Sequence, residues 1–133
     1  CRYLEDLYPE PSLFGSSYIE KAAIEMWQNR VVFELMLPLA MTFRHTHPAM
    51  AKMENQNASY GEQQRDVALG SLKYFDKHLA GSEYIAGDAF SFADIQVITT
   101  IQMFLPLNKI PMEDFENISS YNELLSARPS CQV

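Results

Sequence analysis

Residues 91–105, SFADIQVITTIQMFL, decide the fold of this chain of 133 residues. Ser91 and Asp94 have the spacing of a capping box, in which a serine and an acidic residue three positions later each satisfy a free backbone amide at a helix start. Phe90 before the cap and Ile95 in the first turn add a hydrophobic staple. The helix that follows is apolar on most sides, which predicts a place in the middle of a helical bundle.

A long helix is predicted upstream of this central one. It begins at a second capping box, Ser17 and Glu20, and ends near His47–Pro48. Pro38 lies inside it and should kink it, because proline lacks a backbone amide and clashes with the carbonyl four residues earlier. The apolar stripe expected to face the core recurs at helical spacing, interrupted only by Arg30, and comprises Ile19, Ala23, Met26, Phe33 and Leu37.

Two further amphipathic helices are predicted. One begins at a third capping box, Ser59 and Glu62, and ends at Gly81; its apolar face comprises Ala68, Leu72, Phe75 and Leu79. The last helix stops before Pro129, and its apolar residues are Ile118, Tyr121, Leu124 and Leu125. Cys1–Tyr8 is typical of the last turns of a helix that begins upstream of this chain. No stretch alternates polar and apolar residues for long enough to predict a strand, so the expected fold class is all α, with one domain over residues 1–133.

Charge and composition exclude several kinds of partner. The formal net charge is -7 and the ten Lys and Arg residues are scattered, which argues against nucleic acid and anionic membranes as partners. No apolar run approaches the roughly 20 residues that span a bilayer, and the first residues lack the layout of a signal peptide, so we expect a cytoplasmic protein. Cys1 and Cys131 favour two free thiols, although a bridge between the ends is geometrically possible.

Four segments carry a resemblance to a known family. They are CRYLEDLYPEPSLFG at residues 1–15, EMWQNRVVFELMLPLAMTFRHTHP at 25–48, YIAGDAFSFADI at 84–95 and SARPS at 126–130. In this order and spacing they are similar to a bacterial-type cytosolic glutathione S-transferase. The match covers nearly the whole chain and corresponds to the helical C-terminal domain of that family.

The resemblance implies a function and also a missing part. In the family, a thioredoxin-like domain precedes the helical one and supplies most of the glutathione contacts and the residue that lowers the thiol pKa. We expect that domain to be absent here, so that the chain is inactive alone and holds no catalytic residue. In the full-length protein we expect conjugation of glutathione, the co-substrate, to small hydrophobic electrophiles, a role in detoxification, and a homodimer.

The same resemblance singles out Trp27, Arg30, Phe33 and Met36, because the family builds the wall of its hydrophobic substrate pocket on this helix. Aromatic and methionine side chains at this spacing are also typical of an ordinary core. Three environments are open for Arg30. Its aliphatic stem packs on the core while the guanidinium reaches water, or the guanidinium binds an anion across a cleft. A pair with Glu34, four residues later, is also available.

Asp94 and Ser91 resemble the structural N-capping box of the family, and the alternative is a buried Asp94 that acts as a general base. The three histidines, His45, His47 and His78, offer no convergent spacing, so we expect no metal site.

A second function remains open at this point. In the wider relatives of the family, the same helical domain is a non-catalytic docking module of elongation-factor and synthetase-associated proteins. An exposed apolar patch would favour docking, whereas a concave cleft beside Trp27 and Arg30 would favour the enzyme.

Overall fold

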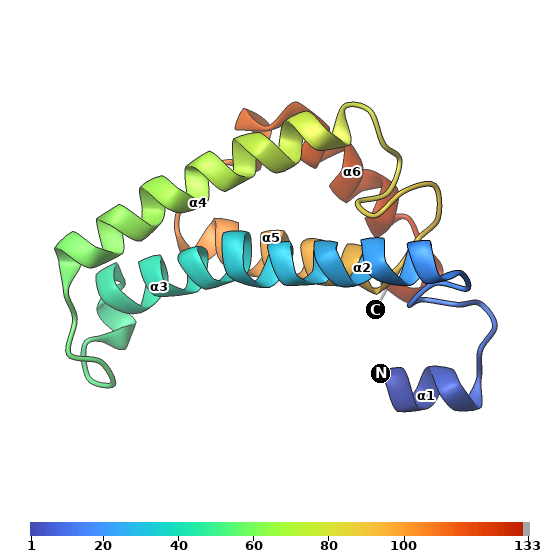
Figure 1. Ribbon diagram of the computed structural model, residues 1–133. Helices are drawn as coiled ribbons and strands as arrows, with labels where there is room; N and C mark the ends of the chain where they lie inside the picture. Colours follow the sequence, from blue (N-terminus) through green and yellow to red (C-terminus); the bar gives the residue numbers. More distant parts are fainter. Residues whose placement is uncertain (132–133) are drawn as a thin grey trace.

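The computed structural model describes residues 1–131 and confirms the all-α fold (Figure 1). Within these residues the β structure consists of an isolated bridge between Tyr84 and Gly87. The helices are α1 (Arg2–Leu7), α2 (Tyr18–Arg30), a π-helix (Val31–Met36), α3 (Leu37–Thr46), α4 (Ala58–Leu79), α5 (Phe92–Leu107) and α6 (Glu116–Ser126). Short 3-10 turns lie at Pro48–Met50, Met112–Asp114 and Pro129–Cys131.

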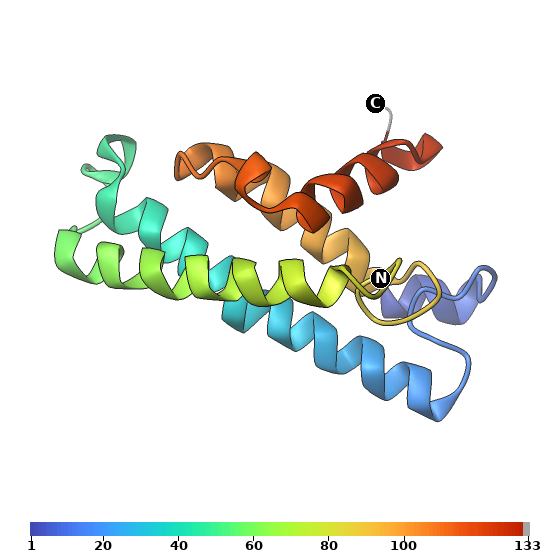
Figure 2. The ribbon, with the colours of Figure 1, turned by 90° about the horizontal axis from the view of Figure 1, so that it is seen from above.

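The long helix and α4 form an antiparallel pair that α5 and α6 complete (Figures 1 and 2). The segments α2, the π-helix and α3 follow one another without a break and make one rod. α5 runs beside this rod in the same direction, and the side-chain Nδ2 of Asn108, just after α5, donates a 3.0 Å hydrogen bond to the carbonyl of Leu39 in α3. α1 lies apart from the bundle, and none of its residues is buried.

α5 is central to the core, as predicted. It buries Ala93, Asp94, Val97, Ile98, Thr100, Ile101 and Leu105. The predicted apolar faces of the other helices are confirmed for Ala68, Leu72, Phe75 and Leu79 of α4 and for Ile118, Tyr121 and Leu125 of α6. Leu124 of α6 is exposed instead.

The rod contains a π-helix, Val31–Met36, just before Pro38. The amide of Leu37 donates to the carbonyl of Val32, five residues earlier, where an α-helix would use the residue four earlier. Proline has no amide to donate and its ring crowds the preceding turn, so a wider turn before it relieves the clash. The rod then continues to Thr46, with His47 as its C-cap, which confirms the predicted end.

The capping signals near the start of the rod and of α4 differ in outcome. Ser17 and Glu20 form the predicted capping box at α2, with the Glu20 amide 3.2 Å from the Ser17 hydroxyl. The box predicted at Ser59 and Glu62 is wrong. Asn57 is the N-cap of α4 and its side-chain oxygen accepts from the Tyr60 amide at 3.1 Å, so α4 begins two residues earlier than Ser59 requires.

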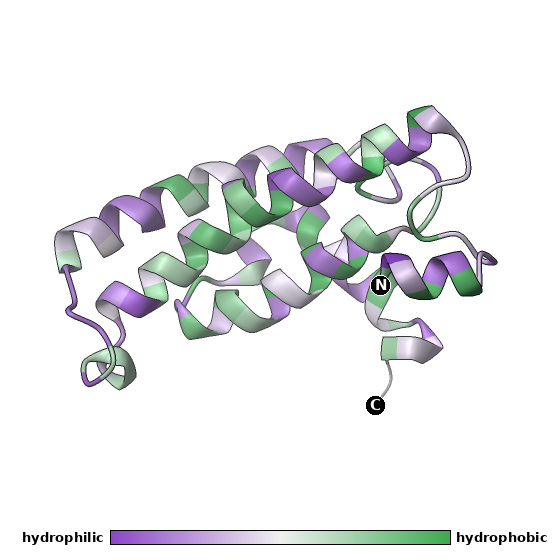
Figure 3. Ribbon diagram, turned by 60° about the horizontal axis from the view of Figure 1, so that its bottom comes forward, coloured by the Kyte–Doolittle hydropathy of each residue, from purple (hydrophilic) through white to green (hydrophobic). Residues whose placement is uncertain are grey.

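The predicted core stripe of the rod is also wrong. Ile19, Met26, Phe33 and Leu37 are 41% to 83% exposed, and the buried residues are Ile24, Trp27, Val31, Leu35 and Leu39. Apolar residues occur on more than one side of this helix, and Figure 3 shows apolar turns interspersed with polar ones along the long helices. The rod therefore buries one apolar face and leaves a second one open to solvent.

Two smaller features complete the fold. Among residues 1–131, no helix combines the length and the apolar character that crossing a membrane requires. Cys1 and Cys131 are exposed free thiols.

Candidate functional site

The predicted site residues begin with Trp27, which α2 turns toward α4. Only 6% of Trp27 is exposed, because its ring lies 4.2 Å from the His78 ring and 5.7 Å from the Phe75 ring, centre to centre. His78 is held in turn, since its Nε2 lies 3.0 Å from the carbonyl oxygen of Ile85. Trp27 is thus part of the core between the two helices.

Arg30 lies one turn further along and bridges to α4. Its guanidinium stacks 4.3 Å from the Tyr74 ring centre and donates a 2.6 Å hydrogen bond to the Tyr74 hydroxyl. Glu34 pairs with the same guanidinium at 3.1 Å, which confirms the predicted local ion pair. Partial burial disfavours the charge of Arg30, but the contacts with Tyr74 and Glu34 outweigh it and raise its pKa above the ordinary value.

Phe33 and Met36 lie on the π-helix and have different surroundings from Trp27. Phe33 is 63% exposed, and Met36 is half-buried. The four predicted residues therefore do not enclose a common pocket within this chain. Trp27 belongs to the core and Arg30 to an ion pair, whereas Phe33 and Met36 contribute apolar surface on the outside of the rod.

Asp94 lies in a fully satisfied polar cluster at the start of α5. Its carboxylate is 0% exposed and accepts from the Ser91 amide and hydroxyl, both at 2.7 Å, and from the Ile85 amide at 2.8 Å. The Tyr121 hydroxyl adds a fourth hydrogen bond at 2.5 Å. Burial raises the pKa of Tyr121, and the neighbouring Asp94 charge adds to this, so its hydroxyl stays a donor. A carboxylate with four donors is suited to holding the fold together and poorly suited to accepting a proton from a substrate.

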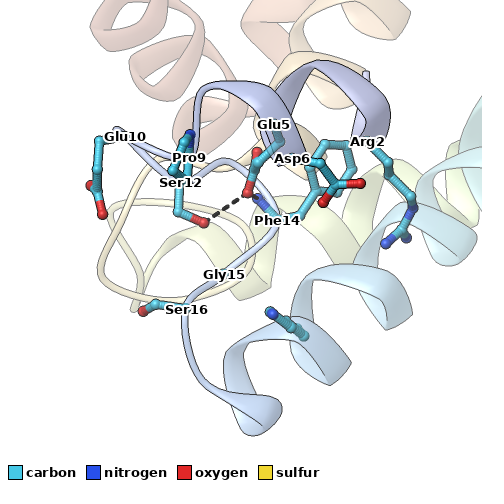
Figure 4. A pocket seen from close by; sticks show the side chains of 10 residues that line it. Arg2, Glu5, Asp6, Pro9, Glu10, Ser12, Phe14, Gly15 and Ser16 are labelled. Atoms are coloured by element: carbon cyan, nitrogen blue, oxygen red, sulfur yellow. Dashed lines mark hydrogen bonds between the residues drawn. The ribbon is translucent and has the colours of Figure 1, made fainter.

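A cavity of about 470 Å³ lies near the N-terminus, between α1 and the start of α2 (Figure 4). Glu5 points into the segment that joins the two helices and accepts from the Ser12 hydroxyl at 2.8 Å and the amides of Leu13 and Phe14 at 2.9 and 3.0 Å. Arg2 stacks over the Phe14 ring and pairs with Glu25 of α2. Glu5 and Arg2 therefore both have partners within the chain, and these contacts fasten α1 to the bundle.

Comparison with known proteins identifies the family. Residues 35–129 match the model of the glutathione S-transferase C-terminal domain. This chain belongs to that family.

Two curated relatives of this glutathione S-transferase domain are fungal proteins, and the chain covers a little over half of each. Glutathione S-transferase 2 of Saccharomyces cerevisiae is 35% identical over 96% of this chain and 56% of its own. Glutathione S-transferase stcT of Emericella nidulans is 31% identical over 89% of this chain and 54% of its own. The chain therefore spans about half the length of these relatives.

Solved structures agree with this glutathione S-transferase assignment. Gtt2 from Saccharomyces cerevisiae superposes with a TM-score of 0.88 at 34% identity, over 98% of this chain and 64% of that structure. A Gtt2-class glutathione S-transferase of Vibrio parahaemolyticus superposes with a TM-score of 0.85 at 33% identity, over 99% of this chain and 61% of that structure.

Sequence reasoning missed the α4 side of the transferase domain's aromatic cluster. Tyr74 and His78 are four residues apart and therefore share a helix face beside the buried Phe75 and Leu79, which is a weak signal of a shared contact. The remaining histidines bind the backbone, since His45 Nδ1 accepts from the Asn57 amide and His47 Nδ1 from the Ala49 amide, each at 3.2 Å. No group of three potential metal ligands occurs within the described residues.

Proposed function

We propose that this chain is the electrophile-binding and dimerisation half of a glutathione S-transferase. In the complete protein a preceding thioredoxin-like domain binds glutathione, the co-substrate, and this half presents hydrophobic electrophiles to its thiolate. Sequence identity of 35% with a relative of which this chain covers only 56% supports a partner domain in that remainder. A cytoplasmic location and a role in detoxification belong to the same proposal.

The observation that carries the proposal is the open apolar face of the rod, formed by Met26, Phe33 and Leu37. Large apolar side chains gathered on one face mark a surface that another protein part covers. α1 adds further exposed apolar side chains, Tyr3, Leu4, Leu7 and Tyr8. We assign these surfaces to the preceding domain and to a second copy of the chain, which together bury them.

The chain alone carries one apolar wall of the substrate pocket in this scheme, and the pocket is complete only when the preceding domain closes against the rod. Phe33 and Met36 then provide apolar wall for the electrophile, and Trp27 and Arg30 support that wall from behind. The chain alone is inactive, because a free thiol with a pKa near 8.5 is weakly ionised at neutral pH and needs a group that stabilises its thiolate.

Calorimetric titration tests the proposal with two ligands, glutathione and S-hexylglutathione, added to the folded chain. The hexyl tail reports the apolar wall, whereas glutathione reports the peptide site. We expect the conjugate to bind weakly, Phe33→Ala to weaken it further, and glutathione not to bind. Tight glutathione binding, or conjugation activity of the chain alone, would contradict the assignment of glutathione binding to the preceding domain.

A docking module is the second candidate, and one observation favours it. Trp27, Arg30, Phe33 and Met36 do not line the cavities at the N-terminal end of the bundle or the cavity beside Tyr74 and His78. Phe33 is instead part of the open apolar face of the rod. An open apolar patch suits a protein partner better than a small ligand. Failure of both ligands to bind the folded chain, with a stable complex to a synthetase or elongation-factor partner, would decide for docking.

A further inference from the structure

A second cavity, of about 400 Å³, lies on the other side of the segment that joins α1 to α2. Its volume is in the range of small-molecule sites, roughly 300–1,000 Å³. Apolar groups from the first turns of α2 and from the loop before α5 make up much of the wall, namely Ile19, Ala23, Ile24, Ala86, Ala89 and Phe90. None of the four residues of the proposed electrophile wall takes part.

The joining segment forms a firmly held wall of this cavity. Glu5 binds it through the hydrogen bonds that Figure 4 shows, and the Leu13 carbonyl accepts from the Phe92 amide at 2.9 Å. The rings of Phe14 and Phe92 stack with centres 4.9 Å apart. Gly15 has a φ of +87° and leaves no room for a Cβ beside Glu20, so this wall keeps its path.

The loop before α5 forms the opposite wall and is held equally well. Asp94 accepts hydrogen bonds from the amides at both ends of this loop, Ile85 and Ser91. Between them Gly87 has a φ of +143°, and its neighbours Ala86 and Ala89 are small enough to leave the space open. The cavity is therefore present before any ligand arrives, which spares the entropy cost of forming it.

The charged side chains that line this cavity are both acidic, and one cation, Arg128, stacks on the Phe90 ring with its guanidinium carbon 3.7 Å from the ring centre. Glu20 and Asp88 line the cavity, and its lining contains no Lys, Arg or His. The Ser16 hydroxyl and amide lower the pKa of Glu20, which therefore stays ionised at neutral pH. Glu20 already binds Ser16 and Ser17, whereas Asp88 makes no hydrogen bond or ion pair among residues 1–131. One carboxylate at the rim is thus free for a ligand.

We propose that this cavity binds small molecules with an apolar body and a protonated amine at one end. The body fills the space against Ile19, Ala23 and Ile24, and the ammonium group pairs with Asp88 at the rim. A carboxylate ligand of the same shape binds less well, because both charged groups of the lining are negative and Arg128 is already engaged with the Phe90 ring.

Nuclear magnetic resonance titration of the chain with three matched probes tests this site. The probes are 4-phenylbutylamine, 4-phenylbutanol and 4-phenylbutyrate, which share one apolar body and differ in the charge of the end group. We expect shift changes centred on residues 12–24 and 86–91, with the amine binding best and the carboxylate worst. Added salt should weaken binding of the amine more than binding of the alcohol, because salt screens the charge pair.

Three variants separate the charge from the cavity. Asp88→Asn should lower the affinity for the amine about two- to fivefold, the range expected for loss of an exposed ion pair, and leave the affinity for the alcohol unchanged. Ala23→Leu should fill the space and abolish binding of both, whereas Ala22→Leu, on the exposed side of the same helix, should change neither. Equal binding of the amine and the carboxylate, or equal effects of the two leucine variants, would overturn the proposal.

Discussion

The Tyr121 hydroxyl on α6 donates a 2.5 Å hydrogen bond to the buried Asp94 carboxylate at the start of α5. The oxygen of Asp94 that receives it also accepts from the Ile85 amide, so one side chain joins the last helix, the central helix and the loop between α4 and α5. A buried carboxylate keeps its charge only where such donors surround it. The bond therefore ties the packing of α6 to the buried polar cluster at the start of α5.

Removal of that hydroxyl should cost stability. We expect Tyr121→Phe to lower the free energy of unfolding by about 1–3 kcal/mol, because Asp94 loses a donor in a place that water does not reach. Urea denaturation followed by circular dichroism measures it. Ser120→Ala is the control, since that hydroxyl is exposed and donates only to the Glu116 carbonyl of its own helix, and it should change stability by less than about 0.5 kcal/mol. Equal losses in the two variants would contradict the role given to the Tyr121–Asp94 bond.

Local signals in the sequence predicted the fold well where neighbouring residues satisfy each other. The capping boxes at Ser17 and Ser91 depend on side chains three positions apart, and both are present in the structure. The false box at Ser59 shows the limit of this reasoning. Asn57, two residues earlier, is an equally good N-cap, and the sequence alone does not rank the two.

The candidate site was harder to predict because its residues depend on contacts between helices. The rod carries apolar residues on two faces, and periodicity does not indicate which face the bundle covers. The π-helix before Pro38 also changes the residues per turn midway along the rod. Arg30 found its predicted partner Glu34 within the helix, but Tyr74, 44 positions away, was beyond any local pattern.

Glu5 should make stability depend on pH. Burial opposes its charge, but the hydrogen bonds from Phe14, Leu13 and Ser12 outweigh it and lower its pKa below the ordinary value of 4.5. A lowered pKa stabilises the fold above the unfolded-state pKa, and this contribution disappears as the pH falls through the folded-state value. At pH 7 we expect Glu5→Gln to lower the free energy of unfolding by about 0.5 kcal/mol or less, since Glu5 is only partly buried and solvent screens its charge.

Thermal unfolding of Glu5→Gln and of the parent chain between pH 7 and pH 3 measures that dependence. The difference in stability should shrink as the pH falls below 4.5. Glu10→Gln, which lines the same cavity and makes no hydrogen bond among the described residues, should match the parent at each pH. A Glu5→Gln difference that grows on acidification would show the opposite linkage.

Two glycines on α4 should respond to alanine with opposite signs. A Cβ at Gly70 would meet nothing within 4 Å, so Gly70→Ala should stabilise the helix by about 0.5–1 kcal/mol. A Cβ at Gly61 would lie 2.5 Å from the Thr46 methyl carbon and 3.1 Å from the His45 Cβ. Gly61→Ala should therefore destabilise the packing of α4 on α3 by about 1–3 kcal/mol. Urea denaturation of both variants measures the changes, and a shift of the same sign in both would contradict the packing of this helix pair.

The open face of the rod should control association of the chain. Phe33 is 63% exposed, so Phe33→Lys should leave the fold and its thermal stability nearly unchanged. In a dimer through this face, the same change buries a charge without a partner, and we expect the dissociation constant to rise at least tenfold, about 1.4 kcal/mol or more. Sedimentation equilibrium measures it, with Met53→Lys, in the turn region after α3, as an exposed control that should not alter association. A parent chain that stays monomeric at high concentration would leave this apolar face to the preceding domain or to a docking partner. A dimer that tolerates Phe33→Lys would place the contact between copies on another surface.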